Sequence, residues 1–190
     1  FDLAGPDPVL LAVGMMRDGD KLASYRVLAD ALTGLGDRNW TLVIVGDGPA
    51  RSSVEDAFAA VPPARIRYAG RANPGALAPL YAAADLMVWP AVNEAYGMAI
   101  LEAQATGLPV VAGDTGGVPD IVHHGETGLL CPVGNARAFA DAVDNLLGAP
   151  DQIDAFSAAA RKRTEAENGL AAASETLDRI LQGGRKAAAA

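Results

Sequence analysis

The stretch Trp40-Thr41-Leu42-Val43-Ile44-Val45-Gly46-Asp47-Gly48-Pro49 joins an almost continuously apolar run to a glycine-rich turn and a proline. A continuous apolar run, unlike an alternating one, is typical of a strand in a parallel sheet that is covered on both faces. Proline is favoured in the first turn of a helix, so Pro49 indicates that a helix follows. The stretch therefore predicts a strand-turn-helix unit of an α/β fold.

The same unit recurs along the chain. Five further short apolar runs are predicted strands: Val9–Val13, Ile66–Ala69, Asp85–Trp89, Pro109–Ala112 and Gly128–Cys131. The segments between them have apolar residues at spacings of three and four, which is the period of one helix face. Strands and helices that alternate through short connections predict right-handed crossovers. We therefore expect a doubly wound, mostly parallel, six-stranded Rossmann-like sheet with helices on both faces.

The chain after Cys131 predicts helices instead of further strands. Apolar residues at helical spacing indicate one helix that ends near residues 148–150, and the Ala-rich residues 151–182 indicate one or two more. Residues 183–190 (GGRKAAAA) are low-complexity, so we expect a frayed tail there. Because no repeat or linker divides the chain, residues 1–182 are expected to form a single Rossmann-like domain.

Composition limits the class of partner. The 190 residues are 51% hydrophobic and carry a formal net charge of -8, which suits a globular domain and not a nucleic-acid-binding one. No apolar run reaches the roughly 18 residues that a transmembrane helix needs. The single Cys131 cannot form an internal disulfide and suits a reducing compartment.

The turns after the first two strands do not match the two common glycine-rich nucleotide motifs. The glycines of residues 14–21 have the wrong spacing for G-x-G-x-x-G, and Arg51 stands where a third glycine should follow Gly46 and Gly48. The sequence contains no P-loop either. The sequence therefore lacks the phosphate-binding motifs of a dinucleotide-dependent oxidoreductase and of a P-loop NTPase.

The most informative candidate site is the stretch Asn93-Glu94-Ala95-Tyr96-Gly97-Met98-Ala99-Ile100-Leu101-Glu102, because ligands bind beyond the carboxyl ends of parallel strands. Glu94 precedes the expected helix and Glu102 lies about two turns inside it, so roughly 10 Å can separate the carboxylates. The backbone N–H groups of residues 96–98 can bind a phosphate at the helix start. Carboxylates accept hydrogen bonds from vicinal diols, so the stretch suits a diphosphate with a sugar at each end.

The spacing Glu94-x7-Glu102 resembles the acidic pair of the group 1 glycosyltransferases, which are retaining enzymes with two facing Rossmann-like domains. Five further segments resemble that family in the same order, within roughly residues 8–150: 42–49, 80–85, 107–112, 116–122 and 125–130. The chain is thus identified as a member of this family, as the C-terminal donor-binding domain of a retaining family 4 enzyme of the GT-B fold. An N-terminal acceptor domain is then expected outside this chain.

The resemblance implies a role for each residue that matches the family motifs. Glu94 would hold the transferred hexose, Glu102 the ribose hydroxyls, and the amides of residues 96–98 the diphosphate. In the family, an Arg directly follows the glycine of the first loop and a Lys follows five residues on, whereas here Met15 follows Gly14. The predicted catalytic residues are Glu94, Lys21 and Arg17, and the predicted nucleotide-binding residues are Glu102, Gly14, Tyr96, Gly97, Met98 and Arg71.

The implied activity is transfer of a hexose from a UDP-, GDP- or ADP-sugar to an unidentified acceptor, with retention of configuration and without a metal or other cofactor. We also expect a cytoplasmic protein, placed at a membrane surface if its acceptor is a lipid. Because one of two domains is present, we expect the isolated fragment to be inactive in transfer.

Two alternatives remain open. One is another enzyme on the same scaffold, such as a glycogen-type phosphorylase or a nucleotide-sugar epimerase. A phosphorylase would need a lysine for pyridoxal phosphate, and no predicted strand offers an obvious one. The other is a non-enzymatic nucleotide-binding module, which the presence of both Glu94 and Glu102 disfavours.

Overall fold

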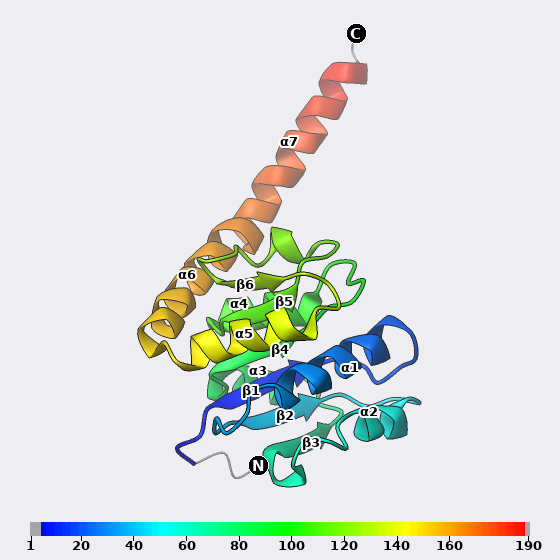
Figure 1. The fold of residues 1–190 in the computed structure, drawn as a ribbon. Coiled ribbons are helices and arrows are strands. Elements are labelled where there is room, and N and C mark those ends of the chain that lie inside the picture. The colour runs from blue at the N-terminus through cyan, green and yellow to red at the C-terminus, as the bar shows by residue number, and fades with distance from the viewer. Residues whose placement is uncertain (1–4, 189–190) are drawn as a thin grey trace.

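Six parallel strands form one sheet in the computed structural model, which describes residues 5–188 apart from the side chains of Pro74 and residues 182–188 (Figure 1). The strand order is β3-β2-β1-β4-β5-β6. Each strand begins and ends within one residue of its predicted run, and the doubly wound Rossmann-like fold is confirmed. The strands are β1 (Val9–Val13), β2 (Thr41–Val45), β3 (Ile66–Gly70), β4 (Leu86–Trp89), β5 (Val110–Gly113) and β6 (Gly128–Cys131).

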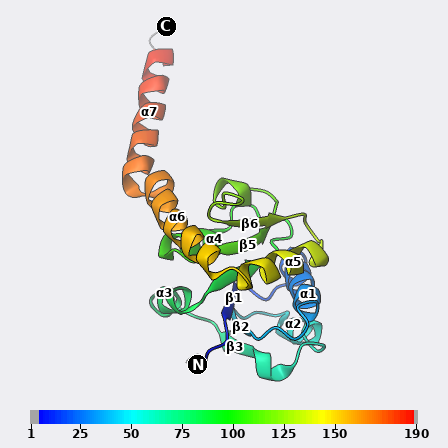
Figure 2. The same cartoon turned by 60° about the vertical axis from the view of Figure 1, so that its left-hand side comes forward.

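Helices cover both faces of the sheet, as the continuously apolar strands require. Helices α1 (Asp20–Thr33), α2 (Arg51–Ala57) and α5 (Ala136–Leu147) pack on one face. Helices α3 (Pro74–Ala83) and α4 (Met98–Thr106) lie on the other face, where α6 (Pro150–Asn168) packs against α4 (Figure 2). The central strands are buried between these layers, and Leu10, Leu42 and Leu86 have no exposed surface. Two short 3₁₀ helices lie in the connections, at Pro63–Arg65 and Val118–Asp120.

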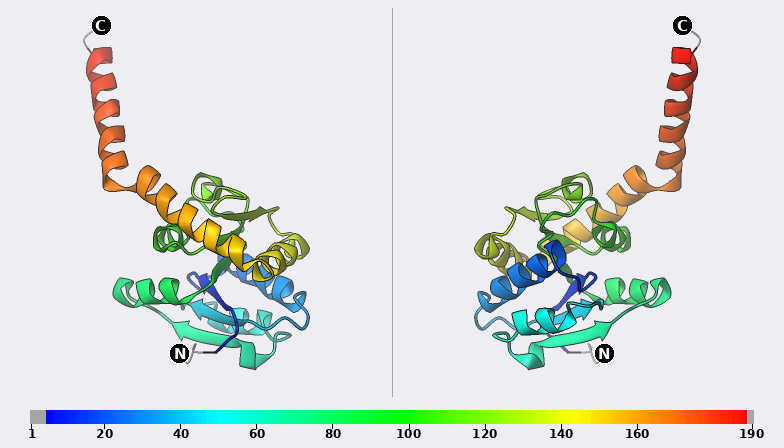
Figure 3. Two further views of the ribbon diagram at one scale, coloured as in Figure 1. Left: turned by 90° about the vertical axis from the view of Figure 1, so that its left-hand side faces the viewer. Right: turned by 90° about the vertical axis from the view of Figure 1, so that its right-hand side faces the viewer.

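The C-terminal region differs in part from its prediction. Helix α6 is followed by α7 (Leu170–Ala188), which projects away from the body (Figure 3). Residues 183–188 therefore belong to a helix, although we expected a frayed tail, and residues 189–190 lie outside the described residues. These residues continue α7 although two of them are glycines, which disfavour a helix interior. Among the described residues, every helix is too short or too polar to span a bilayer.

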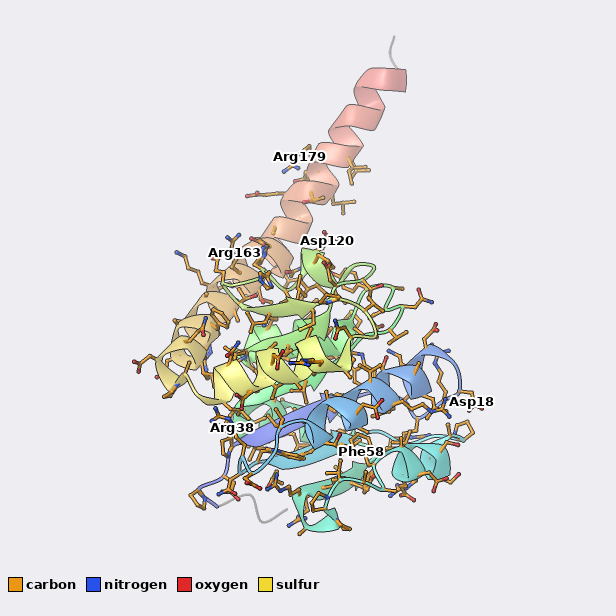
Figure 4. The ribbon with its side chains drawn as sticks, viewed as in Figure 1. Asp18, Arg38, Phe58, Asp120, Arg163 and Arg179 are labelled. Carbon is orange, nitrogen blue, oxygen red and sulfur yellow. The ribbon has the colours of Figure 1, made fainter. Side chains whose placement is uncertain are left out.

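The seam between β1 and β4 positions the site. Strand β1 pairs with β2 at five positions but with β4 only at two, Leu10 with Leu86 and Leu11 with Met87. At this switch point the chain turns to α1 on one face and to α4 on the other, and such a divergence opens a crevice beyond the strand ends. In Figure 4, Asp18 lies in the loop after β1, at the carboxyl ends of the strands, and Arg38 lies at their amino ends.

Candidate functional site

A cavity of about 1040 Å³ opens beyond the carboxyl ends of β1, β2 and β4. This volume is at the upper end of the range for small-molecule sites, roughly 300–1,000 Å³. The structure brings all the predicted site residues to this one cavity, from segments that are far apart in sequence. They are Gly14, Arg17, Lys21, Arg71, Glu94, Tyr96, Gly97, Met98 and Glu102.

Three side chains form a charged and aromatic cluster in the wall of the cavity. Lys21, in the first turn of α1, forms an ion pair with Oε2 of Glu94, and the two side chains are 17% and 18% exposed. Nε1 of Trp89 donates a hydrogen bond of 3.2 Å to the same oxygen. The Lys21 ammonium also lies 5.3 Å from the centre of the Trp89 ring, within the range of a cation–π contact. Glu94 thus receives two donors at one oxygen, and the charge of Lys21 is balanced inside the cavity.

Trp89 is held rigidly behind this cluster. It is the last residue of β4, is 2% exposed, and packs edge-to-face against Tyr25 with ring centres 5.0 Å apart. The Tyr25 hydroxyl donates to the carbonyl oxygen of Gly14 at 2.7 Å, and the Gly14 N–H donates to Val45 at 3.0 Å. Burial raises the pKa of Tyr25 above its ordinary value, so the hydroxyl keeps its proton as a donor. The indole is therefore tied to the ends of β1 and β2.

The loop that carries Glu94 is fastened to α1. Ala91 and Asn93 have positive φ angles of 51° and 55°; this backbone is tolerated by Asn but is uncommon for Ala, so the surroundings must hold it at Ala91. The Val92 N–H donates to the buried Ser24 hydroxyl at 2.9 Å, and the Asn93 amide donates to Asp20 at 2.8 Å. Because Lys21 lies on the same helix, these bonds fix Glu94 and Lys21 relative to each other.

Two glycines hold the same loop from the side of β5. Gly116 has a φ of 53°, and a Cβ at this position would overlap the carbonyl oxygen of Glu94. The Gly117 N–H donates to the carbonyl of Ala95 at 3.1 Å. The 3₁₀ helix that starts at Val118 follows directly. The segment Gly116-Gly117-Val118-Pro119, which resembles a family motif in the sequence, thus supports the Glu94 loop by backbone contact.

The N-terminus of α4 presents free donors to the cavity. The helix begins at Met98, and its N-cap Gly97 has a left-handed backbone with a φ of 94°. Among the described residues, the N–H groups of Tyr96, Gly97 and Met98 donate no hydrogen bond. Free N–H groups at a helix start carry partial positive charge, so this end of the cavity suits an anion.

Glu102 lies farther along α4, on the same cavity. Its Oε2 accepts a hydrogen bond of 2.9 Å from the hydroxyl of Tyr81 on α3. Burial, and then the negative charge of Glu102, raise the pKa of Tyr81 above its ordinary value, so this hydroxyl stays protonated. Arg17 and Arg71 are exposed at the cavity wall, in the loops after β1 and β3. No cluster of three or more His, Cys, Asp or Glu side chains suited to a metal ion occurs in the part of the chain that the structure describes.

Two further residues of the site, Trp89 and Tyr81, were not predicted from the sequence. Trp89 ends the apolar run Asp85–Trp89, and Tyr81 lies in a segment with apolar residues at helical spacing, so neither was named as a site residue. Their polar atoms are what tie them to Glu94 and Glu102. The available signal was their type, because buried Trp and Tyr usually find a hydrogen-bond partner for the N–H or O–H group.

Comparison with known proteins gives matches along most of the chain. The family model described as "Glycosyl transferases group 1" matches residues 7–149. The chain is 33% identical over 148 residues to D-inositol 3-phosphate glycosyltransferase of Corynebacterium glutamicum, covering 75% of this chain and 32% of that protein. It is 33% identical over 127 residues to sulfoquinovosyl transferase SQD2 of Arabidopsis thaliana, covering 65% of this chain and 24% of that protein.

Solved structures match as well. Sucrose-phosphate synthase from Thermosynechococcus elongatus has a TM-score of 0.78 and 27% identity, with 94% of this chain and 46% of that chain covered. Anabaena Alr3699/HepE, solved in complex with UDP and glucose, has a TM-score of 0.81 and 22% identity, with 95% of this chain and 49% of that chain covered. At this identity, the similarity shows a shared fold. The chain thus spans about a third of the length of the first of these curated relatives and about half of the solved chains.

Proposed function

Because the chain belongs to the group 1 glycosyl transferases, we propose that its cavity binds a nucleoside-diphosphate sugar and that the complete protein transfers the hexose with retention of configuration. One observation carries the proposal. The cavity combines a helix start with free N–H groups, the cation Lys21, and two carboxylates on either side of that helix start. A nucleotide sugar has matching parts, a diphosphate between two groups that bear hydroxyls.

We place the diphosphate at the N-terminus of α4. The free N–H groups of Tyr96, Gly97 and Met98 donate to its oxygens there, and Lys21 adds a full positive charge. During transfer, negative charge grows on the leaving diphosphate, and fixed donors of this kind stabilise it without reorganisation. Arg17 lies in the loop just before α1, the helix that carries Lys21, and contributes at longer range. This arrangement needs no metal ion.

The two carboxylates then hold the two ends of the donor. Glu94, beside Lys21 and Trp89, accepts hydrogen bonds from hydroxyls of the hexose. Glu102, about two helical turns along α4, accepts them from the ribose. Arg71, across the cavity at the end of β3, borders the base. Of the UDP-, GDP- and ADP-sugars we place the UDP-sugar first, since the structural neighbour Alr3699/HepE was solved with UDP and with UDP-glucose.

The acceptor is assigned to a further domain of the complete protein. The relatives are two to three times as long as this chain, so they have room for a second domain that covers the cavity. A site closed by two domains excludes water and aligns the donor with its acceptor. We therefore expect residues 1–190 alone to show at most slow donor hydrolysis. We also propose that the complete protein is cytoplasmic and lies at a membrane surface if its acceptor is a lipid.

The test uses the full-length protein with UDP-, GDP- and ADP-hexoses and a panel of acceptors, read by NMR. We expect one nucleotide sugar to be consumed and a glycoside to form with the donor's anomeric configuration, read from the anomeric proton coupling. An inverted product, or efficient transfer by residues 1–190 alone, would contradict the proposal. Conversion of the donor to an isomeric nucleotide sugar without an acceptor would indicate an epimerase instead. Bound pyridoxal phosphate, visible by absorbance, would indicate a phosphorylase.

A further inference from the structure

We propose that Trp89 is a positioning residue, which orients Glu94 toward the donor sugar through its indole N–H. The inference rests on the proposed function of the cavity. Glu94 receives both of its hydrogen bonds at one oxygen, Oε2, from Lys21 and from Trp89. Its Oε1 accepts none from the described residues. The carboxylate is thus held by one oxygen and offers the other to a ligand.

The two donors differ in how firmly they can hold Glu94. Lys21 has a flexible side chain whose ammonium carries three donors, and the proposed function assigns it to the diphosphate. Any turn of Lys21 toward phosphate weakens its hold on Glu94. The N–H of Trp89 then remains as the fixed partner of the carboxylate within the described part of the chain. The indole N–H is therefore needed most when the nucleotide sugar is bound.

The surroundings of Trp89 fit this role. Its side chain is 2% exposed and packs against the Tyr25 ring, so the direction of the N–H bond is set by the core. A Cβ at Gly14 would lie 2.9 Å from Cη2 of the indole, which is too close for a side chain at that position. Gly14 therefore makes room for the indole, in addition to lining the cavity.

The experiment replaces the indole by a ring that has no N–H. Trp89→Phe in the full-length enzyme should leave the affinity for UDP within about twofold. It should lower kcat with the nucleotide sugar by about tenfold or more, because a hydrogen bond to a charged group is lost. Trp40→Phe is the matched control. Trp40 is also 2% exposed, and its Nε1 has no hydrogen-bond partner among the described residues. It lies directly before β2, at the amino end of that strand and therefore away from the cavity.

A double-mutant cycle separates positioning from packing. If Trp89 acts through Glu94, Trp89→Phe should change kcat by less than about twofold in a Glu94→Ala background, where the indole N–H has no side-chain acceptor at position 94. The same loss in both backgrounds would overturn the proposal. Wild-type protein that binds neither UDP nor a nucleotide sugar would instead overturn the proposed function.

A measurement on folded protein with Trp89 intact covers the case in which Trp89→Phe does not fold. In ¹⁵N-labelled full-length protein, Glu94→Gln should shift the indole N–H resonance of Trp89. Glu102→Gln should leave that resonance in place, since Glu102 bonds to Tyr81. If Glu94→Gln moves no indole resonance, the hydrogen bond does not exist in solution and the inference is wrong.

Discussion

Lys21 and Glu94 form an ion pair across the crevice between β1 and β4, although 73 residues separate them in sequence. Both side chains are less than a fifth exposed, so the pair is more weakly screened than one in open solvent. The proposed function gives the two residues different partners, phosphate for Lys21 and hexose for Glu94. The binding of a diphosphate must therefore compete with the pair.

The competition predicts that Glu94→Gln strengthens the binding of UDP while it impairs transfer. Removal of the carboxylate frees Lys21 for phosphate and removes a negative charge beside the diphosphate, which should tighten UDP binding by about three- to tenfold. Isothermal titration calorimetry measures this directly. Asp18→Asn is the control, because it makes the same change in net charge at an exposed site in the loop before α1. Weaker UDP binding by Glu94→Gln would show that Glu94 contacts the nucleotide itself.

The hydrogen bond between Tyr81 and Glu102 predicts that substitutions at the two residues weaken nucleotide binding to different degrees. Glu102→Ala should weaken UDP binding by roughly tenfold or more, because the ribose loses a charged hydrogen-bond partner. Tyr81→Phe should weaken it less, since the carboxylate stays but loses its orienting donor. Glu165→Ala removes an exposed carboxylate on α6 and should change nothing. Unchanged affinity in Glu102→Ala would remove Glu102 from the nucleotide site.

The free N–H groups of α4 predict that nucleotide binding does not depend on a divalent metal. Helix amides and Lys21 supply the positive charge that a metal would otherwise supply. The dissociation constant for UDP should be the same in EDTA as in millimolar Mg²⁺. A loss of binding in EDTA that Mg²⁺ restores would mean that the phosphate site lies elsewhere.

The contact between Gly116 and the Glu94 loop predicts a difference between two glycine substitutions. Gly116→Ala should lower the free energy of unfolding by at least about 2 kcal/mol, through strain at a positive φ together with overlap of the Glu94 carbonyl. Gly125 also has a positive φ, 79°, but nothing lies within 4 Å of its Cβ position. Gly125→Ala should therefore cost only about 1 kcal/mol, from backbone strain alone. Urea denaturation compares the two, and equal losses would contradict the steric argument.

The sequence specified the strands because each is a short apolar run that must be covered on both faces. It also indicated Glu94 and Glu102, since their spacing along the chain matches a family motif. It could not give the Lys21–Glu94 pair or the Trp89 hydrogen bond. Those contacts require β1 and β4 to be neighbours, and alternation of strands and helices does not specify strand order. The type of a buried Trp or Tyr also does not indicate which residue accepts the hydrogen bond from its N–H or O–H group.

The glycines at the strand ends determine where this site can change over evolutionary time. A Cβ at Gly46 would overlap the Gly14 carbonyl, one at Gly48 that of Met16, and one at Gly116 that of Glu94. At these points two segments of backbone are in contact, so a side chain larger than that of glycine would displace one of them. The cavity also has three exposed side chains, Met15, Tyr96 and Met98, whose replacement would leave these backbone contacts undisturbed. A change of preference among nucleotide sugars, natural or engineered, should begin with those three positions, because the glycine contacts keep the surrounding backbone in place.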